Sequence, residues 1–250
     1  TTYTTATANG TTWTQTRNNI TDFTTPFAIE DIQAELGAKN IVEVKVFLQG
    51  PFDGTSTMYT NLQTAGLVPL NDPFGTGESA TSIGVDIVDW IQIEMRDPTD
   101  ATNIIATKSA LLRNDGQIVS LDGTLGVAFN NLGISSAYIA VRHRNHLGVM
   151  SSIPVALDNA TYIYDFTQST AKAIGQNQLK SIGNIFAMYA GDINGDHIIN
   201  NQDYNYYQLN TGSSLNYAKA DMNGDGNTDA LDFDLWSKNR SKLGQFRAAN

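Results

Sequence analysis

Apolar and polar residues alternate along the middle of the chain, between residues 41 and 166. A period of two is typical of strands that bury one face against a core. The clearest run covers residues 85–95. One of its faces would hold Ile87, Asp89, Ile91 and Ile93, and the other Val88, Trp90, Gln92 and Glu94. We therefore predict a strand here.

Shorter runs of the same kind follow one another, with turn residues between them. Asp53-Gly54, Asn114-Asp115-Gly116 and Asp122-Gly123 favour tight turns because these residue types tolerate the required backbone conformations. The other expected strands cover residues 41–48, 104–106, 109–112, 117–120, 125–129, 136–142, 153–157 and 161–166. Many short strands at regular spacing predict a mainly β fold, with an antiparallel β-sandwich over residues 40–168.

Residues 1–39 are rich in Thr and poor in large aliphatic side chains. Thr and aromatic residues favour extended structure, but this segment offers little core of its own. We predict an N-terminal arm. It is either a frayed tail or a strand that completes a sheet edge, in its own domain or in a neighbouring copy. A short helical turn is expected at residues 29–36, ended by Gly37.

Residues 169–190 are predicted to connect the sandwich to a C-terminal module over residues 191–250. The apolar residues Leu179, Ile182, Ile185 and Phe186 have the spacing of one helical face or of a short strand pair. Either arrangement would bury one side of the connector between the two parts.

The C-terminal module contains two near-copies of one polar pattern, and Asp221 follows Asp192 by 29 residues. Oxygen-bearing side chains fall at positions 1, 3, 5, 9 and 12 of each copy, and position 7 supplies its backbone carbonyl. This is the register of a twelve-residue calcium loop, because Ca²⁺ needs six to eight oxygen ligands. The predicted ligands are Asp192, Asn194, Asp196, Ile198, Asn200 and Asp203 in the first loop, and Asp221, Asn223, Asp225, Asn227, Asp229 and Asp232 in the second.

The two loops differ at position 6, where a sharp turn favours Gly. The second loop has Gly226 there, whereas the first has His197. His tolerates a left-handed conformation at some cost, so we predict two Ca²⁺ sites of which the first binds more weakly. We interpret His197 as a strained turn residue and not as a ligand. The alternative is a pair of Asx turns that cap helices, which explains the first Asp of each loop but not all five oxygens.

A helix is expected after each loop, over residues 203–209 and 232–236. Tyr204 matches Phe233, and Tyr207 matches Trp236, at equal offsets from the closing Asp. These aromatic residues are predicted to pack the two helices together. The stretch resembles a dockerin domain, a duplicated loop–helix calcium module. The resemblance implies binding to a cohesin domain through loop positions 10 and 11, here Asn201-Gln202 and Ala230-Leu231. These pairs are unlike each other and lack the Ser-Thr type of cellulosomal modules.

Residues 41–168 resemble a β-sandwich module of large secreted surface proteins of Bacteroidetes. The resemblance is carried by residues 49–52 (Gln-Gly-Pro-Phe), 88–91 (Val-Asp-Trp-Ile), 95–98 (Met-Arg-Asp-Pro) and 140–150. It implies a sandwich that precedes paired calcium loops, and it implies no defined activity.

Composition and charge narrow the function classes. The 250 residues suit one medium domain and one small one. With 25 acidic and 15 basic residues, the chain has a net charge of −10 and no basic stripe, which disfavours nucleic acid as a partner. There is no Cys, which excludes disulfides and thiolate chemistry. No apolar run is long enough for a membrane span, and the start at Thr1 shows no signal peptide, as expected of a mature or trimmed fragment.

The sequence gives little evidence of catalytic residues. The sequence lacks a G-x-S-x-G elbow, a phosphate-binding Gly loop, a dinucleotide fingerprint and an H-E-x-x-H motif. Asp86 with Asp89, or Asp89 with Glu94, could imitate the acid–base pair of a glycosidase, but acidic residues on an exposed strand face are the ordinary case. His143 and His146 would lie on opposite faces of a strand, so we interpret them as polar residues of a hairpin end. We predict no enzymatic activity.

Our main hypothesis is a secreted, calcium-stabilised structural or cell-surface protein that assembles with copies of itself or with another surface protein into a filament or matrix. Calcium loops that close with Asp indicate an extracellular place with plentiful Ca²⁺, on the order of millimolar. One alternative is a dockerin-type adaptor that binds a cohesin-like receptor. The other is a carbohydrate-binding module that uses Trp90, Trp13 or surface Tyr residues.

Overall fold

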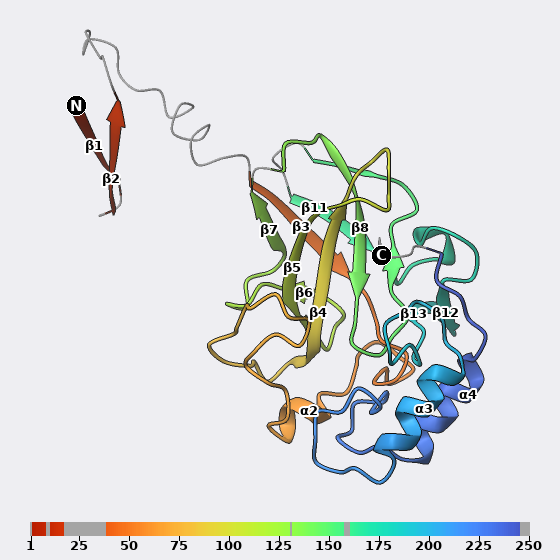
Figure 1. Cartoon of the computed structure of the whole chain (residues 1–250). Helices are drawn as coiled ribbons and strands as arrows, with labels where there is room; N and C mark the ends of the chain where they lie inside the picture. The colour runs from red at the N-terminus through yellow and green to blue at the C-terminus, as the bar shows by residue number, and fades with distance from the viewer. Residues whose placement is uncertain (1, 9–10, 18–38, 131, 158–160, 246–250) are drawn as a thin grey trace. The chain divides into compact units, whose positions relative to one another are not determined.

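The computed structural model describes residues 2–8, 11–17, 39–130, 132–157 and 161–245, and the chain forms two compact units, Thr1–Ala38 and Lys39–Asn250 (Figure 1). In the first unit, β1 (Thr2–Ala8) and β2 (Thr11–Arg17) form an antiparallel pair. The extended structure predicted for this Thr-rich segment is found at residues 2–8 and 11–17, where the two strands pair with each other, while the predicted arm over residues 1–39 stays a prediction. The helical turn predicted at residues 29–36 lies outside the described residues.

The second unit contains a large antiparallel sheet. Its strand order is β10 (Val155–Ala156), β8 (Ser136–Arg142), β4 (Ile87–Arg96), β5 (Ile104–Arg113) and β6 (Ile118–Val119), and β9 (Val149–Met150) also pairs with β8. The longest pairing joins β4 and β5, which run together from Ile87 opposite Arg113 to Arg96 opposite Ile104. The strands β4, β6, β8 and β10 match predicted runs, whereas β5 joins two runs that were expected separately and β9 was not predicted.

A second sheet has the order β11 (Thr161–Asp165), β3 (Lys39–Lys45) and β7 (Val127–Asn130). Strands β3 and β7 are antiparallel, but β11 runs parallel to β3, with Thr161 opposite Ile41. The expectation of a purely antiparallel sandwich is wrong at this edge. The physical reason is that β11 reaches β3 after a connection through all the other sandwich strands, and not through a hairpin.

The main core lies between the two sheets. It includes Val42 and Val44 of β3, Ile91 and Ile93 of β4, and Phe129 of β7, which are all buried. Two sheets that bury a shared apolar layer form a β-sandwich. The predicted fold class, a mainly β sandwich followed by a small helical module, is confirmed.

A bulge in β4 changes the predicted faces of this strand. The register shifts between Ile87, opposite Arg113, and Asp89, opposite Leu112. As a result Val88 joins the main core, whereas Ile87 packs with Trp90 in a second cluster on the outer face. The face assignment is therefore wrong for Ile87 and Val88, because the extra residue reverses the alternation. Every residue of β4 is buried, since the outer face is also covered, in part by α2 (Asn61–Thr64).

Residues after the sandwich strands form a strand pair, which was one of the two arrangements left open. The antiparallel strands β12 (Leu179–Ile182) and β13 (Ile185–Met188) follow a short 3-10 turn at Thr170–Lys172. Leu179 and Met188 contribute to the main core. The segment thus packs onto the sandwich, while the predicted boundaries at 168 and 190 stay predictions.

Two ten-residue helices complete the unit, α3 (Asn201–Asn210) and α4 (Ala230–Asn239) (Figure 1). Tyr207 donates from its hydroxyl to the carbonyl of Asp229 at 3.0 Å, and the Tyr204 ring stacks on Trp236 at 4.9 Å. The helices are therefore antiparallel. The predicted aromatic packing between them is confirmed. Among the described residues, no helix has the length and apolar character of a membrane span.

Candidate metal centre

The first loop is closed by its two end carboxylates. Asp203 accepts hydrogen bonds at Oδ1 from the backbone N–H of Ile193 (2.7 Å) and Asn194 (3.1 Å), and at Oδ2 from Asn200 (2.9 Å). Asp192 accepts from the N–H of Gly195 (3.0 Å) and His197 (3.2 Å). Both carboxylates are buried. Positions 1 and 12 thus organise the backbone of the loop.

The second loop repeats these contacts. Asp232 accepts from the N–H of Met222 (2.7 Å), Asn223 (3.1 Å) and Asp229 (2.9 Å). Asp221 accepts from the N–H of Gly224 (2.8 Å) and Gly226 (2.9 Å) and is also buried. The two loops therefore have the same internal structure, as their shared sequence pattern predicts.

The middle positions bond to one another. The Asn194 amide donates to Asp196 at 2.8 Å, and the Asn223 amide donates to Asp225 at 2.9 Å. At position 7, the N–H of Ile198 and of Asn227 donates to the position 5 carboxylate.

The position 9 residues, Asn200 and Asp229, cap α3 and α4 and form capping boxes with the closing Asp residues. The Asx-turn alternative thus describes part of each loop. Among the residues that the structure describes, no three His, Cys, Asp or Glu side chains meet as a metal-binding group. The twelve ligand assignments stay predictions.

The buried carboxylates lack sufficient counter-charge within the loops. Burial, together with the nearby charges of Asp203 and Asp196, raises the pKa of Asp192 to about 7. Burial likewise raises the pKa of Asp221 to about 7, although Arg144 opposes this shift. The pKa values of Asp203 and Asp232 are also raised by burial. Buried acids of this kind, surrounded by amide and carbonyl oxygens, fit a hard divalent cation such as Ca²⁺.

Position 6 has the backbone conformation expected from the sequence. His197 has a φ of 65°, and Gly226 has a φ of 86°. A non-Gly residue adopts this left-handed region only at an energetic cost. The interpretation of His197 as a strained turn residue is confirmed.

A buried polar cluster joins the sandwich to the second loop, and sequence reasoning missed it. We define the junction cluster as Asp89, His143, Arg144, Asn145, His146 and Tyr217. Asp89, which is 2% exposed, accepts from Arg144 Nε at 2.8 Å, from His143 Nε2 at 3.2 Å and from the Tyr217 hydroxyl. The run Arg-His-Arg-Asn-His at 142–146 is unusually polar for this chain, which was the available signal.

The expectation of exposed strand acids is wrong for Asp89 and Glu94. Glu94 is 2% exposed, accepts from Arg96 Nε at 2.8 Å, and pairs with Arg142 at 3.3 Å. Burial opposes the charge of Asp89, but Arg144 and His143 hold the pKa of its carboxyl below the ordinary value. Both acids are paired in buried sites, because other parts of the fold cover this strand.

The two His residues are part of the hairpin end, as predicted. His146 Nε2 accepts from the N–H of Gly50 at 3.2 Å, and the Nδ1 atoms of His143 and His146 are 3.1 Å apart. His143 donates to Asp89, so one chain of hydrogen bonds connects Gly50 to Asp89. Burial lowers the pKa of both imidazoles, which keeps them neutral in this chain.

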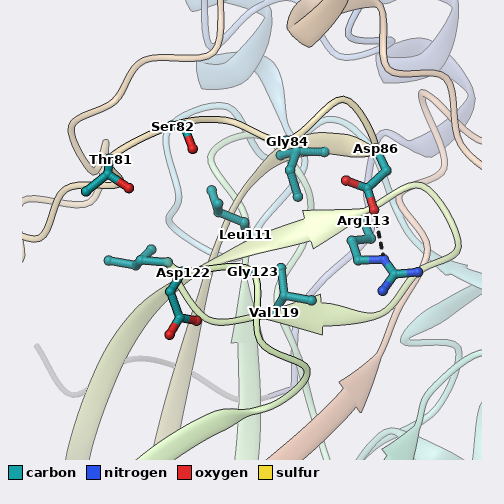
Figure 2. A pocket seen from close by; sticks show the side chains of 11 residues that line it. Thr81, Ser82, Gly84, Asp86, Leu111, Arg113, Val119, Asp122 and Gly123 are labelled. Carbon is teal, nitrogen blue, oxygen red and sulfur yellow. Dashed lines mark ion pairs between the residues drawn. The ribbon is translucent and has the colours of Figure 1, made fainter.

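One of the aromatic side chains proposed to bind sugar, Trp90, is not available, whereas the side chain of Trp13 lies outside the part of the chain that the structure describes. Trp90 is fully buried and donates from Nε1 to the carbonyl of Pro69 at 2.8 Å. A pocket of about 170 Å³ lies beside this strand, and Asp86 pairs with Arg113 at 3.2 Å in its lining. Figure 2 shows the side chains that line it. Leu111, Val119 and Asp122 are among its other lining residues, and none of the lining residues is aromatic. The role of Trp90 as a carbohydrate platform is therefore wrong.

Residues 190–239 match the family model of the dockerin type I domain. No curated protein matches the chain. Two crystal structures of the type II cohesin-X-dockerin complex from Acetivibrio cellulolyticus are similar at 16% identity and a TM-score of 0.41. The match to the N-terminal interface mutant covers 81% of this chain and 97% of the other, and the match to the C-terminal interface mutant covers 83% and 98%. These TM-scores are too low to show a shared fold.

The resemblance of residues 41–168 to surface modules of Bacteroidetes is not supported by these matches. The dockerin match, in contrast, covers both polar loops and both following helices. The match supports calcium binding by these loops, since dockerin domains bind Ca²⁺ in loops of this type. The duplicated loop–helix module predicted from the sequence is therefore a match to the dockerin type I domain over residues 190–239.

Proposed function

We propose that the chain is an extracellular adaptor whose dockerin-like module binds a cohesin-like domain of another protein in the presence of calcium. The observation that carries this proposal is the exposed apolar pair at positions 10 and 11 of the second loop. Ala230 is exposed, and Leu231 is 58% exposed. The corresponding Asn201 and Gln202 are exposed but polar. The two halves of the module thus offer chemically different surfaces, and the second is the better protein-binding surface.

Further apolar residues lie at the same end of the helix pair. Because α3 and α4 are antiparallel, the end of α3 lies beside the start of α4. Leu209 near the end of α3 is 84% exposed, and Tyr206 is also exposed. Single exposed apolar residues are ordinary, but several at one end of a small module are typical of a protein interface.

Calcium would be bound by both loops in this proposal, one ion in each and more weakly in the first. The five side-chain ligands and the position 7 carbonyl of each loop would hold the ion. When bound, Ca²⁺ supplies positive charge that neutralises the clustered carboxylates. The chain itself fixes the backbone where each helix begins, because Asp203 and Asp232 each accept hydrogen bonds from three backbone N–H groups of their loop. Calcium would thereby present Ala230 and Leu231 in a fixed position.

The proposal is tested by calorimetric titration of the full chain with a panel of purified cohesin domains, in calcium and in excess chelator. We expect at least one cohesin to bind in calcium only. Leu231→Asp should abolish that binding, whereas Gln202→Ala, at the matching position of the first loop, should leave it nearly unchanged. A folded, calcium-loaded chain that binds no cohesin of the panel would overturn the proposal.

Self-assembly is the second candidate function, and the N-terminal unit favours it. In the part of the chain that the structure describes, β1 and β2 pair only with each other. A two-stranded sheet is marginally stable alone and gains from further strands. The chain would then be a calcium-stabilised subunit of an extracellular filament or matrix. Sedimentation of the full chain in calcium and in excess chelator discriminates the two functions. Polymers that dissociate in chelator support self-assembly, whereas a monomer in both solutions supports the adaptor function.

A further inference from the structure

We propose that the turn between β8 and β9 positions the second calcium loop through Arg144 and Asn145, and that Asp89 supplies the counter-charge that makes Arg144 compatible with a bound cation. The inference rests on the proposed calcium binding. It assigns a metal-site role to residues of the sandwich that lie outside both loops and make no contact with the ion themselves.

The positioning is visible in the hydrogen bonds to the chain that enters the loop. The Asn145 amide donates to the carbonyl of Lys219 at 2.8 Å and to that of Asp221 at 2.6 Å. Arg144 donates from Nη2 to the Asp221 carbonyl at 3.4 Å and from Nη1 to the carbonyl of Ala218. Asp221 is position 1 of the loop. Two sandwich side chains therefore fix the backbone of its first ligand.

Both side chains are held rigidly for this task. Asn145 is fully buried, and its carbonyl oxygen faces His146 Nδ1 at 2.7 Å. The guanidinium of Arg144 lies 4.3 Å from the centre of the Tyr217 ring and is bonded to Asp89. A ligand whose backbone is fixed before the ion arrives loses less conformational freedom on binding. The turn should therefore raise the calcium affinity of the second loop.

A buried Arg beside a calcium site would ordinarily weaken binding, because two positive charges repel each other. Asp89 removes this conflict. It carries a negative charge in the fold and lies 2.8 Å from Arg144 Nε. The Arg144–Asp89 pair is close to neutral as a unit, so the guanidinium donates its hydrogen bonds without adding net charge next to Asp221.

The first loop receives much weaker support from the same turn. The carbonyl of Asn145 accepts from the N–H of Gly191 at 2.9 Å, just before the loop, and Arg142 reaches the carbonyl of Gly195 at 3.5 Å. Within the turn itself, which the structure describes in full, the side chains of His143, Arg144, Asn145 and His146 bond to other partners and not to the Asp192 carbonyl. The effect of the turn should thus be confined to the second loop.

The test measures calcium binding by titration calorimetry on the full chain carrying Asp192→Ala. This background removes the first site, so the titration reports the calcium affinity of the second loop alone. Asp89→Asn keeps the shape of the side chain and removes its charge. We expect it to weaken calcium binding about ten- to a hundred-fold, the usual effect of losing an outer-shell partner. Asn145→Ala should weaken it to a similar extent. Asp86→Asn, a half-buried acid just before the same strand that pairs with Arg113, is the matched control and should leave the affinity unchanged.

A double variant separates the charge effect from simple damage to the fold. Asp89→Asn with Arg144→Met removes both charges and also the Arg144 hydrogen bonds to the Ala218 and Asp221 carbonyls. It should still bind calcium at least as tightly as Asp89→Asn alone, because the repulsion from an unpaired buried Arg outweighs the two hydrogen bonds that are lost with it. Damage to packing would make the double variant bind more weakly. Equal affinities of Asp89→Asn, Asn145→Ala and their background would overturn the inference, and so would a double variant weaker than Asp89→Asn. A background that binds no calcium at all would overturn the proposed calcium function of the second loop instead.

Discussion

Gly50 packs directly against the backbone of the second loop. A Cβ atom at this position would lie 1.8 Å from the carbonyl oxygen of Met222, which is far inside any allowed contact. The N–H of the same residue donates to His146. Gly50 therefore has no room for a side chain, for a reason of packing and not of backbone conformation.

The first prediction is that Gly50→Ala destabilises the calcium-loaded protein by about 1–3 kcal/mol, the usual cost of forcing an atom into a packed contact. Chemical denaturation in calcium measures it. Gly84→Ala is the matched control, because a Cβ there would meet the flexible carboxylate of Asp86 at 3.0 Å. Equal stabilities of the two variants would contradict the close approach of Gly50 to the second loop.

Asp232 has both a structural and a predicted metal-binding role. Its carboxylate accepts three backbone hydrogen bonds and is buried, so Asp232→Ala leaves these donors without a partner at a cost of about 1–3 kcal/mol each. We expect a lower melting temperature in calcium and little further loss when calcium is removed. Asp234→Ala, an exposed acid on the same helix, should behave like the parent. An Asp232→Ala protein that melts with the parent would refute the site.

At the scale of elements, the sequence was most informative where the pattern was local. The two loops and the two helices follow from spacing within a few dozen residues, and the helices are found at α3 and α4. The bulge in β4 was not predictable, because an extra residue leaves no mark in the alternation of Ile87, Val88 and Asp89. The parallel pairing of β11 with β3 depends on contacts between distant residues, which one sequence does not contain.

The candidate site was predictable to the same degree. The oxygen pattern of each loop and the turn at His197 are visible in the sequence. The junction cluster is not, since Asp89 pairs with Arg144, 55 residues later, and Arg144 bonds to Ala218, 74 residues later still. A polar run such as Arg-His-Arg-Asn-His could equally be solvated. Its burial follows only from the packing of the second loop against the sandwich.

The hairpin end between β8 and β9 predicts a dependence of stability on pH. Burial lowers the pKa of His143 and His146 below the ordinary value of 6.5. The charged groups next to the two imidazoles are Asp89 and Arg144. The unfolded chain then binds protons that the folded chain excludes. This contribution to stability is complete above pH 6.5 and is lost as the pH falls towards the lowered pKa values.

We therefore expect the melting temperature in saturating calcium to fall as the pH is lowered from about 7 to about 5. The variant His143→Asn with His146→Gln should show a shallower fall over the same range. The carboxylates of the loops are present in both proteins, so the difference between the two slopes isolates the imidazoles. Parallel slopes would contradict burial of neutral His at this site.

At the scale of the whole second unit, the sandwich and the loop–helix module share buried hydrogen bonds. The Asn239 amide on α4 donates to Gln49 Oε1 and to the Ala190 carbonyl, both at 2.7 Å. Gln49 also accepts from the N–H of Ala190 at 3.2 Å. Together with the junction cluster, these contacts indicate that the unit unfolds cooperatively.

Calcium removal should consequently affect the sandwich as well as the module. We expect scanning calorimetry to show one main transition for residues 39–250 in calcium, and excess chelator should shift it to lower temperature as a whole. Calcium at a thousand times its Kd would contribute about 4 kcal/mol per site to stability. Two separate transitions in calcium, of which only one responds to chelator, would contradict a cooperative unit.

The contact between Gln49 and Asn239 also has a consequence for synthesis. Its two partners are 190 residues apart, so the ribosome must make most of the chain before the two side chains can meet. Until then, no loop covers Asp89, Arg144 and the two His residues. The sandwich therefore exposes a polar surface to water at one end. Contacts of such long range slow the final folding step. The sandwich should therefore complete its fold only after the loop–helix module has been made and has packed against it.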